Sequence, residues 1–404
     1  MIKISLLGDI ICQMPFLKAA QNRNNDFYTA FSGLQGILSE SDYVVANLET
    51  PIAGENAGYS DELYSFNTPV DFLDGLKKLP IDLYTTANNH CLDRGVEGLK
   101  STMKELEKRG MNYTGTSLSS NSPRFFVKQI GDIKCAFLSY TGYVNEDKWN
   151  KYGKQLSNND LNLLIDMDKY IAYRADLRAR SIPFYKSRKF LGGFIPKKWQ
   201  RGIKDSVGIK VKATIDNEPL KEVKGQFLDK VREDIAQAKK NADIVFLLPH
   251  CGGQFNITPG KLSQELFEQL FLFGADAVIG NHPHTIQKCG LNSNRPYAFS
   301  LGNVSMSPSY PFQVPKSLPE YGMIFHVYVE GKSIVRSSFS IIKATEEIDH
   351  YPIVRPIDEL FAIMDSEGKE TIKSDLNVIF KRIFEQEGEA FGIQKEYALT
   401  ENKQ

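Results

Sequence analysis

Five short apolar segments of this chain each end in a side chain that can bind a metal ion. The side chains are Asp9, Glu49, Asn89, His250 and the pair His282 and His284. The segments before them are short and almost wholly apolar, which is typical of strands buried on both faces of a parallel sheet. The carboxyl ends of such strands meet at one edge of an α/β sheet, and ligands bind there. We therefore expect these six side chains to lie close together.

The rest of the pattern predicts an α/β fold, because strand-like and helix-like segments alternate along most of the chain. The strands that lead to the six side chains are expected at 2–7, 43–48, 82–86, 243–248 and 276–279. Further strands are expected at 125–130 and 134–139, which read as a hairpin around Gly131 and Asp132, and at 297–301, 323–329 and 333–342. Helices are expected at 31–38, 70–79, 95–109, 227–240 and 263–273.

The domain organisation expected is one α/β domain over residues 1–345 and a helical extension over 346–404, with apolar patches at 357–363 and 376–384. A segment at about 145–225 interrupts the α/β rhythm. Between Lys169 and Lys212 it holds thirteen Lys and Arg residues but only two acids, Asp176 and Asp205. Such a segment either binds a polyanion or a phosphorylated substrate, or is a solvated surface whose charge is balanced elsewhere.

Composition excludes some classes of protein. The 404 residues include 49 Lys and Arg and 49 Asp and Glu, so no net charge steers the chain toward nucleic acid or acidic lipid. No signal peptide or membrane-spanning stretch is visible, and we expect a cytoplasmic protein. The number of cysteines is odd and no pair has CxxC spacing, which argues against disulfides. These cysteines are either small buried residues or, in one case, a ligand of a soft metal.

The six side chains suit a particular chemistry. Carboxylate, imidazole and amide oxygen are ligands that Mn, Zn and Fe accept, so we expect one or two divalent ions. Glu49 could bridge two ions, which would lower the pKa of a shared water and supply hydroxide for attack on phosphorus. His90, beside Asn89, could give a proton to the leaving oxygen. The remaining histidines, His326 and His350, are expected to be structural.

The motifs that carry this chemistry resemble a known family, the bacterial CapA-type capsule-synthesis proteins. Those proteins are associated with poly-γ-glutamate capsule, and their domain is related to the calcineurin-like metallophosphoesterases. The resemblance runs from Met1 to about Val304. It rests on Gly8-Asp9, Asn47-Leu48-Glu49-Thr50-Pro51, Ala87-Asn88-Asn89-His90 with Asp93 and Gly95, His250 with Gly252, Gly274-Ala275-Asp276, Gly280-Asn281-His282-Pro283-His284 with Gln287, and Ser300-Leu301-Gly302-Asn303.

The resemblance implies a four-layer αββα sandwich, in which helices flank two mixed β-sheets. It implies that Asp9 and His284 bind a first metal, that Glu49 bridges, and that a second metal is bound by Asn89, His250 and His282. His90 would be the acid near the leaving group, with Asp93 as its orienting partner. Metallophosphoesterases usually carry a His two residues after the first Asp, whereas this chain has Ile11 there.

Two functions follow from these observations. The first is a metal-dependent hydrolase of phosphoesters or of a γ-glutamyl or glycan linkage in a polymer, and the sequence favours it. The second is a non-catalytic accessory protein that binds an anionic polymer for capsule synthesis, as the basic segment would suit. The expected partner is therefore an anionic polymer or a phosphorylated small molecule. A nucleic-acid phosphoesterase fits the neutral net charge less well, and the sequence does not indicate an oligomeric state.

Overall fold

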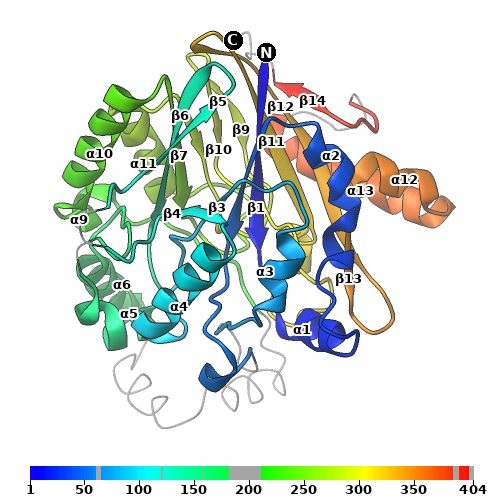
Figure 1. The fold of residues 1–404 in the computed structure, drawn as a ribbon, viewed down its shortest axis with the longest axis horizontal. Helices are drawn as coiled ribbons and strands as arrows, with labels where there is room; N and C mark the ends of the chain where they lie inside the picture. The colour runs from blue at the N-terminus through cyan, green and yellow to red at the C-terminus, as the bar shows by residue number, and fades with distance from the viewer. Residues whose placement is uncertain (61–64, 120–121, 158, 182–210, 385–390, 400–404) are drawn as a thin grey trace.

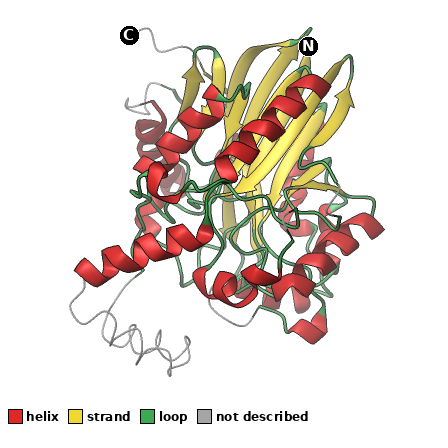
Figure 2. Ribbon diagram, turned by 90° about the vertical axis from the view of Figure 1, so that its left-hand side faces the viewer, coloured by secondary structure: helices red, strands yellow, loops and turns green. Residues whose placement is uncertain are grey.

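Two mixed β-sheets form the centre of the chain, and helices cover their outer faces (Figure 1, Figure 2). The structure is a computed structural model that describes residues 1–60, 65–119, 122–157, 159–181, 211–384 and 391–399. The prediction of two mixed sheets flanked by helices is confirmed.

The first sheet has eight strands in the order β13, β12, β11, β1, β2, β3, β4, with β14 paired to β12. The strands β1 to β4 run parallel, whereas β11 to β14 pair antiparallel. Their bounds are β1 Ile2–Ile10, β2 Tyr43–Leu48, β3 Leu83–Thr85, β4 Asn112–Thr114, β11 Tyr321–Glu330, β12 Ser333–Glu346, β13 Pro352–Pro356 and β14 Tyr397–Leu399.

The second sheet has six strands in the order β5, β6, β7, β8, β10, β9. The strands β6, β7, β8 and β10 run parallel, and β5 and β9 pair antiparallel at the two edges. Their bounds are β5 Phe126–Ile130, β6 Ile133–Thr141, β7 Ile244–His250, β8 Ala277–Ile279, β9 Cys289–Asn292 and β10 Arg295–Ala298.

The sheets share a core made of alternate residues from their facing sides. Ile4 and Val45 of the first sheet and Phe137 and Phe246 of the second belong to one buried cluster. Phe137 stacks on Tyr43 at 5.3 Å between ring centroids and on Phe246 at 5.1 Å. Because successive residues of a strand point to opposite faces, the residues between these pack against helices instead. The inner strands are therefore apolar on both sides, as the sequence predicted.

Helices form the two outer layers. The outer face of the first sheet is covered by α1 Met14–Gln21, η1 Thr29–Leu34, α2 Gln35–Ser39 and α3 Asp71–Leu76. The outer face of the second is covered by α10 Phe227–Asn241 and α11 Lys261–Leu272. The helix α4 Gly95–Lys108 contacts both layers. Its Leu106 packs with the residues on the outer face of the first sheet, and its Leu99 and Met103 pack with those on the outer face of the second. The short 3-10 turns η2 Glu55–Ala57 and η4 Pro315–Ser317 lie in loops.

The segment after residue 345 contains strands as well as the expected helices α12 Ile357–Ile363 and α13 Ser366–Phe384. Both β13 and β14 hydrogen-bond to β12, so the segment extends the first sheet. The helical extension expected over 346–404 thus contains short strands beside its helices. Each of these strands has five residues or fewer, which is too short to show a period of two in the sequence. The boundary at about residue 345 stays a prediction.

The described part of the basic segment consists of α5 Glu146–Tyr152, η3 Gly153–Gln155, α6 Met167–Ser181 and α9 Leu220–Val223. Two arginines of α6 pair with acids: Arg174 lies 3.5 Å from Glu218, and Arg178 lies 3.1 Å from Glu146. Charge is thus balanced locally on α6. The basic residues Lys186, Arg188, Lys189, Lys197, Lys198, Arg201, Lys204 and Lys210 lie outside the described residues.

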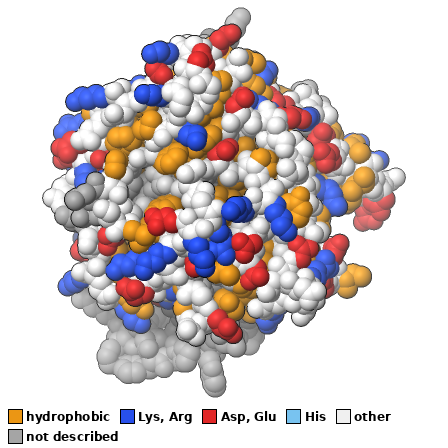
Figure 3. All heavy atoms as spheres, in the orientation of Figure 1, with side chains coloured by type: hydrophobic (Ala, Val, Ile, Leu, Met, Phe, Trp, Pro, Cys, Tyr) orange, Lys and Arg blue, Asp and Glu red, His pale blue; other side chains and the backbone are white. Residues whose placement is uncertain are grey.

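The surface of the folded chain carries charges of both signs, in agreement with the equal numbers of basic and acidic residues in the sequence. On the face drawn in Figure 3, Lys and Arg side chains are interspersed with Asp and Glu side chains. Within the described ranges, no helix combines the length and the apolar character needed to cross a bilayer.

We expect Phe137→Ala to destabilise the protein by about 3–5 kcal/mol, because it removes the ring that joins the two sheets and leaves a cavity. Urea unfolding followed by circular dichroism measures this loss. Leu272→Ala, at a position that is 75% exposed, should change stability by less than about 0.5 kcal/mol. Equal losses for the two variants would contradict a core shared by the sheets.

Candidate metal centre

The predicted site residues come together where strands of both sheets end. Asp9 lies near the end of β1, Glu49 directly follows β2, and His250 is the last residue of β7. Asn89 lies in the loop after β3, and His282 and His284 lie in the loop after β8. All six residues are buried, with 4% exposure at most. The rule that polar strand ends converge therefore holds, although the ends belong to two sheets rather than to one.

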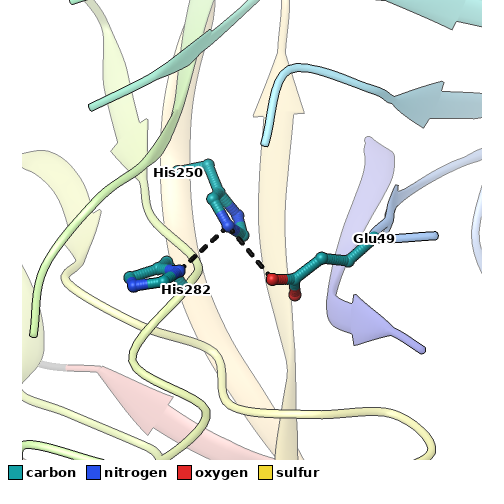
Figure 4. Close-up of side chains that lie close together, drawn as sticks. All are labelled: Glu49, His250 and His282. Carbon is teal, nitrogen blue, oxygen red and sulfur yellow. Dashed lines mark hydrogen bonds and ion pairs between the residues drawn. The ribbon is translucent and has the colours of Figure 1, made fainter. Parts of the chain in front are cut away.

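Glu49 lies at the centre of the cluster and belongs to two possible metal-binding groups. One group consists of Glu49, His250 and His282, and the other of Asp9, Glu49 and His284. In each group the ligand atoms lie within 4.8 Å of one another. Figure 4 shows the imidazole of His250 between the carboxylate of Glu49 and the ring of His282. A carboxylate in this position could contact ions in both groups.

Three further candidate ligand atoms lie close to His250 Nε2, two from the first group and one from Asn89. His250 Nε2 lies 2.8 Å from Asn89 Oδ1, 3.1 Å from His282 Nδ1 and 3.3 Å from Glu49 Oε1. Ligand atoms of a tetrahedral ion with bonds of about 2.1 Å lie about 3.4 Å apart. The four side chains therefore fit one ion with little rearrangement.

The carboxylate of Glu49 is buried, and within the described residues it has no hydrogen bond. Neither of its oxygens has a partner among the described residues, and the side chain is fully buried. Burial raises its pKa well above the ordinary value, and the nearby Asp9 raises it further. A buried carboxylate without donors is costly, and native proteins pair such groups with cations or metals. This environment is suited to a metal ion.

The second group is held by a network of hydrogen bonds. Asn47 Nδ2 donates to Asp9 Oδ1 at 2.7 Å, and the backbone N–H of His282 donates to Asp9 Oδ2 at 3.1 Å. His284 Nδ1 lies 3.3 Å from Asp9 Oδ2 and 2.9 Å from Asn303 Oδ1, and its Nε2 lies 3.7 Å from Glu49 Oε1. Burial raises the pKa of Asp9, but His284, His250 and Asn47 lower it more, so Asp9 stays ionised. Nε2 of His284 is thereby directed at Glu49.

The histidines of the first group are kept neutral, as metal ligands must be. Burial lowers the pKa of His250 to about 4, against the opposing effect of Asp9. Burial also lowers the pKa of His282 well below its ordinary value, and the neighbouring histidines add to the effect. His282 has a φ of 107°, a conformation that favours glycine. Strain of this kind persists only where the surrounding structure enforces it, and it is common at functional sites.

His90 and Asp93 form a pair beside the cluster. His90 Nδ1 lies 2.7 Å from Asp93 Oδ2, and His90 Nε2 lies 4.0 Å from Glu49 Oε1. Asp93 is fixed in turn, because Oδ2 accepts the backbone N–H of Phe66 at 2.6 Å and Oδ1 accepts Asn145 Nδ2 at 3.3 Å. His90 Nε2 is directed at Glu49. If Nδ1 carries the proton shared with Asp93, Nε2 can exchange a proton at the candidate metal centre.

Two residues near the site, Tyr143 and Asn145, were not identified from the sequence. The hydroxyl of Tyr143 contacts His282 Nε2, and Asn145 Oδ1 accepts Asn89 Nδ2 at 3.3 Å. Both follow the carboxyl end of β6, so the convergence of strand ends that located the other residues includes them too. The signal is weaker there, because the expected end of the strand, Ser139, is not followed at once by a charged residue or a histidine.

The cysteines lie outside the cluster. All five are free and buried, and the possible metal-binding groups among the described residues contain none of them. Burial raises the pKa of Cys91 and of Cys251 to about 12, so these two thiols stay protonated near neutral pH. They therefore act as small buried side chains here.

A comparison with known families matches residues 3–307 to the bacterial capsule synthesis protein family PGA_cap. The chain belongs to this family. It is 22% identical over 320 residues to the PGA biosynthesis protein CapA of Bacillus subtilis (strain 168), covering 78% of this chain and 66% of that protein. It is 22% identical over 340 residues to the capsule biosynthesis protein CapA of Bacillus anthracis, covering 82% and 65%. The chain thus spans slightly less than two thirds of these relatives.

Two solved structures are similar to this family member. A hypothetical protein from Thermus thermophilus is 15% identical with a TM-score of 0.38, covering 88% of this chain and 98% of that one. A putative 5'-nucleotidase from Staphylococcus aureus, in complex with alpha-ketoglutarate, is 12% identical with a TM-score of 0.42, covering 93% and 59%. Both TM-scores are below 0.5, so the description of the fold rests on this chain's own sheets and helices.

We expect Tyr143→Phe to weaken metal binding about 10- to 100-fold, because His282 then loses the partner that fixes its ring. Titration of the metal-free protein with Mn²⁺ or Zn²⁺ in a calorimeter measures the affinity. The matched control is Tyr140→Phe, which removes another buried hydroxyl, one that donates to Asp234 at 2.8 Å. An unchanged affinity in Tyr143→Phe, or an equal loss in both variants, would show that Tyr143 does not orient His282.

Proposed function

We propose that this chain is a metal-dependent hydrolase of capsule biosynthesis that cleaves a phosphoester or a linkage within a polymer. The observation that carries the proposal is Glu49, a fully buried carboxylate that has no hydrogen bond among the described residues and is shared by two possible metal-binding groups. Such a carboxylate is stable next to cations and unstable without them. The family, whose named members take part in capsule biosynthesis, supplies the biological setting.

The two metal positions differ in their ligands. We infer that Glu49, Asn89, His250 and His282 hold one divalent ion, and that Asp9, Glu49 and His284 hold a second. At the place where metallophosphoesterases usually have a further His, the side chain of Ile11 packs with Phe66, Phe255 and Met306. An apolar cluster offers no ligand, so we expect the second position to bind its ion more weakly than the first.

Divalent ions such as Mn, Zn or Fe would supply Lewis acidity and an activated water at this site. The residues around them would position the reacting groups. We assign His90 as the proton donor to the leaving oxygen, because its Nε2 faces Glu49 and its Nδ1 is held by Asp93. Asp93 is then a positioning residue, held by Phe66 and Asn145.

An anionic substrate suits the surroundings of the site. Tyr143 stacks on Tyr170 at 5.9 Å, and Arg174 donates to the hydroxyl of Tyr170 at 2.5 Å. These residues link the metal centre to α6, which belongs to the segment with the excess of basic residues. Arg174 lies two aromatic rings away from His282 and pairs with Glu218. The attraction for a substrate that carries phosphate or carboxylate groups would therefore come from the excess of basic residues in the segment as a whole.

Glu49→Gln tests whether the site holds metal. We expect the variant to lose bound metal in elemental analysis and to lose hydrolysis of an aryl phosphate. The metal-free variant should also melt at a higher temperature than the metal-free wild type, because it no longer buries an unpaired carboxylate. Added metal should stabilise the wild type and not the variant.

The control for this experiment is Glu218→Gln, at a buried carboxylate that has an arginine partner. It should keep its metal, and its metal-free form should not be more stable than the wild type. A wild-type protein that folds but retains no metal at micromolar concentrations would contradict the proposal.

His90→Ala separates hydrolysis from binding. We expect kcat to fall about 10²- to 10⁴-fold, as for the loss of a general acid, with the metal content unchanged. His350→Ala, at an exposed histidine, is the control and should keep full activity. If purified wild type binds an anionic polymer but hydrolyses neither it nor an aryl phosphate, the chain is the non-catalytic accessory protein instead.

A further inference from the structure

A second cavity lies apart from the metal centre, between α11, the hairpin of β9 and β10, and α13. Its volume is about 780 Å³, which is within the range of pockets that hold small molecules. Phe267 and Phe271 come from α11, Tyr297 comes from β10, and Phe299 follows β10. None of the six predicted metal ligands lines this cavity. It is therefore a separate site.

Aromatic rings form the floor of the cavity. Phe267 stacks on Phe299 at 4.3 Å between centroids, and Tyr297 meets Phe299 edge to face at 5.6 Å. Two aliphatic side chains on its rim face solvent, with Ile257 45% exposed and Val378 44% exposed. Apolar surface of this kind gains free energy when an apolar ligand covers it. The cavity is thus suited to an alkyl or aromatic group.

Arg382, on α13, adds a positive charge that no acid among the described residues pairs. Its Nη1 donates to Ser317 O at 2.7 Å and to Thr285 Oγ1 at 2.9 Å, and its Nη2 donates to Lys316 O at 3.2 Å. All three acceptors are neutral. Its Nε is buried and has no hydrogen-bond partner in the described part of the chain. Burial lowers the pKa of Arg382 to about 10, although Asp375 and Glu320 oppose the shift.

An unpaired, partly buried guanidinium is a costly feature that an anion would relieve, because Arg binds carboxylate and phosphate through charge-assisted hydrogen bonds. The lining also includes Lys288, Lys381 and Glu268. We propose that this cavity binds a small amphipathic anion, with its apolar body on Phe267 and Phe299 and its carboxylate, phosphate or sulfonate at Arg382. Binding of such an anion does not require the hydrolytic function proposed above.

Arg382 also connects the cavity to the metal centre. Thr285, which accepts its hydrogen bond, directly follows His284, and the hydroxyl of Thr285 donates to the same Ser317 carbonyl that Arg382 contacts. A ligand that draws the guanidinium into the cavity would therefore change the hydrogen bonds next to a metal ligand. This is a short physical route by which an occupant could influence the metal centre.

Fluorescent probes test the proposal on the full chain. Anilinonaphthalenesulfonate has an aromatic body and one negative charge, and phenylnaphthylamine has a similar body without the charge. We expect the anionic probe to bind at one site per chain, at least about tenfold more tightly than the neutral probe. Equal affinity of the two probes, or no saturable binding, would overturn the proposal.

Variants locate the binding. Val378→Glu places a negative charge on the exposed rim and should weaken the anionic probe about tenfold or more. Ile363→Glu is the matched control on α12, where the side chain is 67% exposed and does not line the cavity. It should leave the affinity unchanged. Equal effects of the two substitutions would show that the probe binds elsewhere.

Arg382→Gln tests the charge itself. Glutamine keeps a donor for the Ser317 carbonyl, and we expect it to abolish the preference for the anionic over the neutral probe while the neutral probe still binds. Circular dichroism and the melting temperature report whether the variant is folded. If it unfolds, Val378→Glu and Ile363→Glu still decide the proposal, because both positions are exposed. A folded Arg382→Gln that keeps the preference would contradict the role of Arg382.

Discussion

The buried carboxyl group of Glu49 is the constraint on which the arrangement around the candidate metal centre depends. Glu49 is fully buried and its carboxylate has no donor among the described residues, while three histidines lie within 4.0 Å of it. Burial lowers the pKa of His250, which favours its neutral form, whereas at His284 the raising effect of Glu49 and Asp9 exceeds the lowering effect of burial. The geometry is therefore consistent with a site built for cations, in which the protein supplies ligands and leaves the compensating charge to the ions.

The packing of the two sheets against each other holds the side chains of the candidate site in fixed positions. The proposed ligands lie at or after the ends of β1, β2, β3, β7 and β8, which are inner strands of the two sheets. Stacking of Phe137 between Tyr43 and Phe246 fixes the sheets relative to each other. Sites on rigid elements hold their geometry more closely than sites on loops alone. The backbone strain at His282 is stable only because this framework surrounds it.

Side chains beside the proposed ligands connect the candidate site to two neighbouring parts of the structure. Tyr143 contacts His282 and stacks on Tyr170, and Arg174 lies behind it on α6. On the other side, Arg382 reaches Thr285, the residue after His284. The candidate metal centre is thus connected on one side to α6, whose Arg174 pairs with Glu218, and on the other side to an aromatic cavity.

The sequence by itself predicted which side chains come together at the candidate metal centre. Apolar strands that end in Asp9, Glu49 and His250 predict convergence, because the direction of parallel strands places their carboxyl ends together. The same rule extends to Tyr143 and Asn145, which follow the end of β6. It could not show that the strand ends belong to two sheets, because the pairing of strands distant in sequence leaves no local pattern.

Only the tertiary structure decided the remaining features. The strands β13 and β14 are too short to show a period, and their place is set by hydrogen bonds to β12. The missing hydrogen bonds of Glu49 and of Arg382 Nε, within the described part of the chain, depend on which neighbours packing brings close. Such neighbours come from segments far apart along the chain, so residue types can indicate the chemistry of a site, but only the fold establishes which charges stay uncompensated.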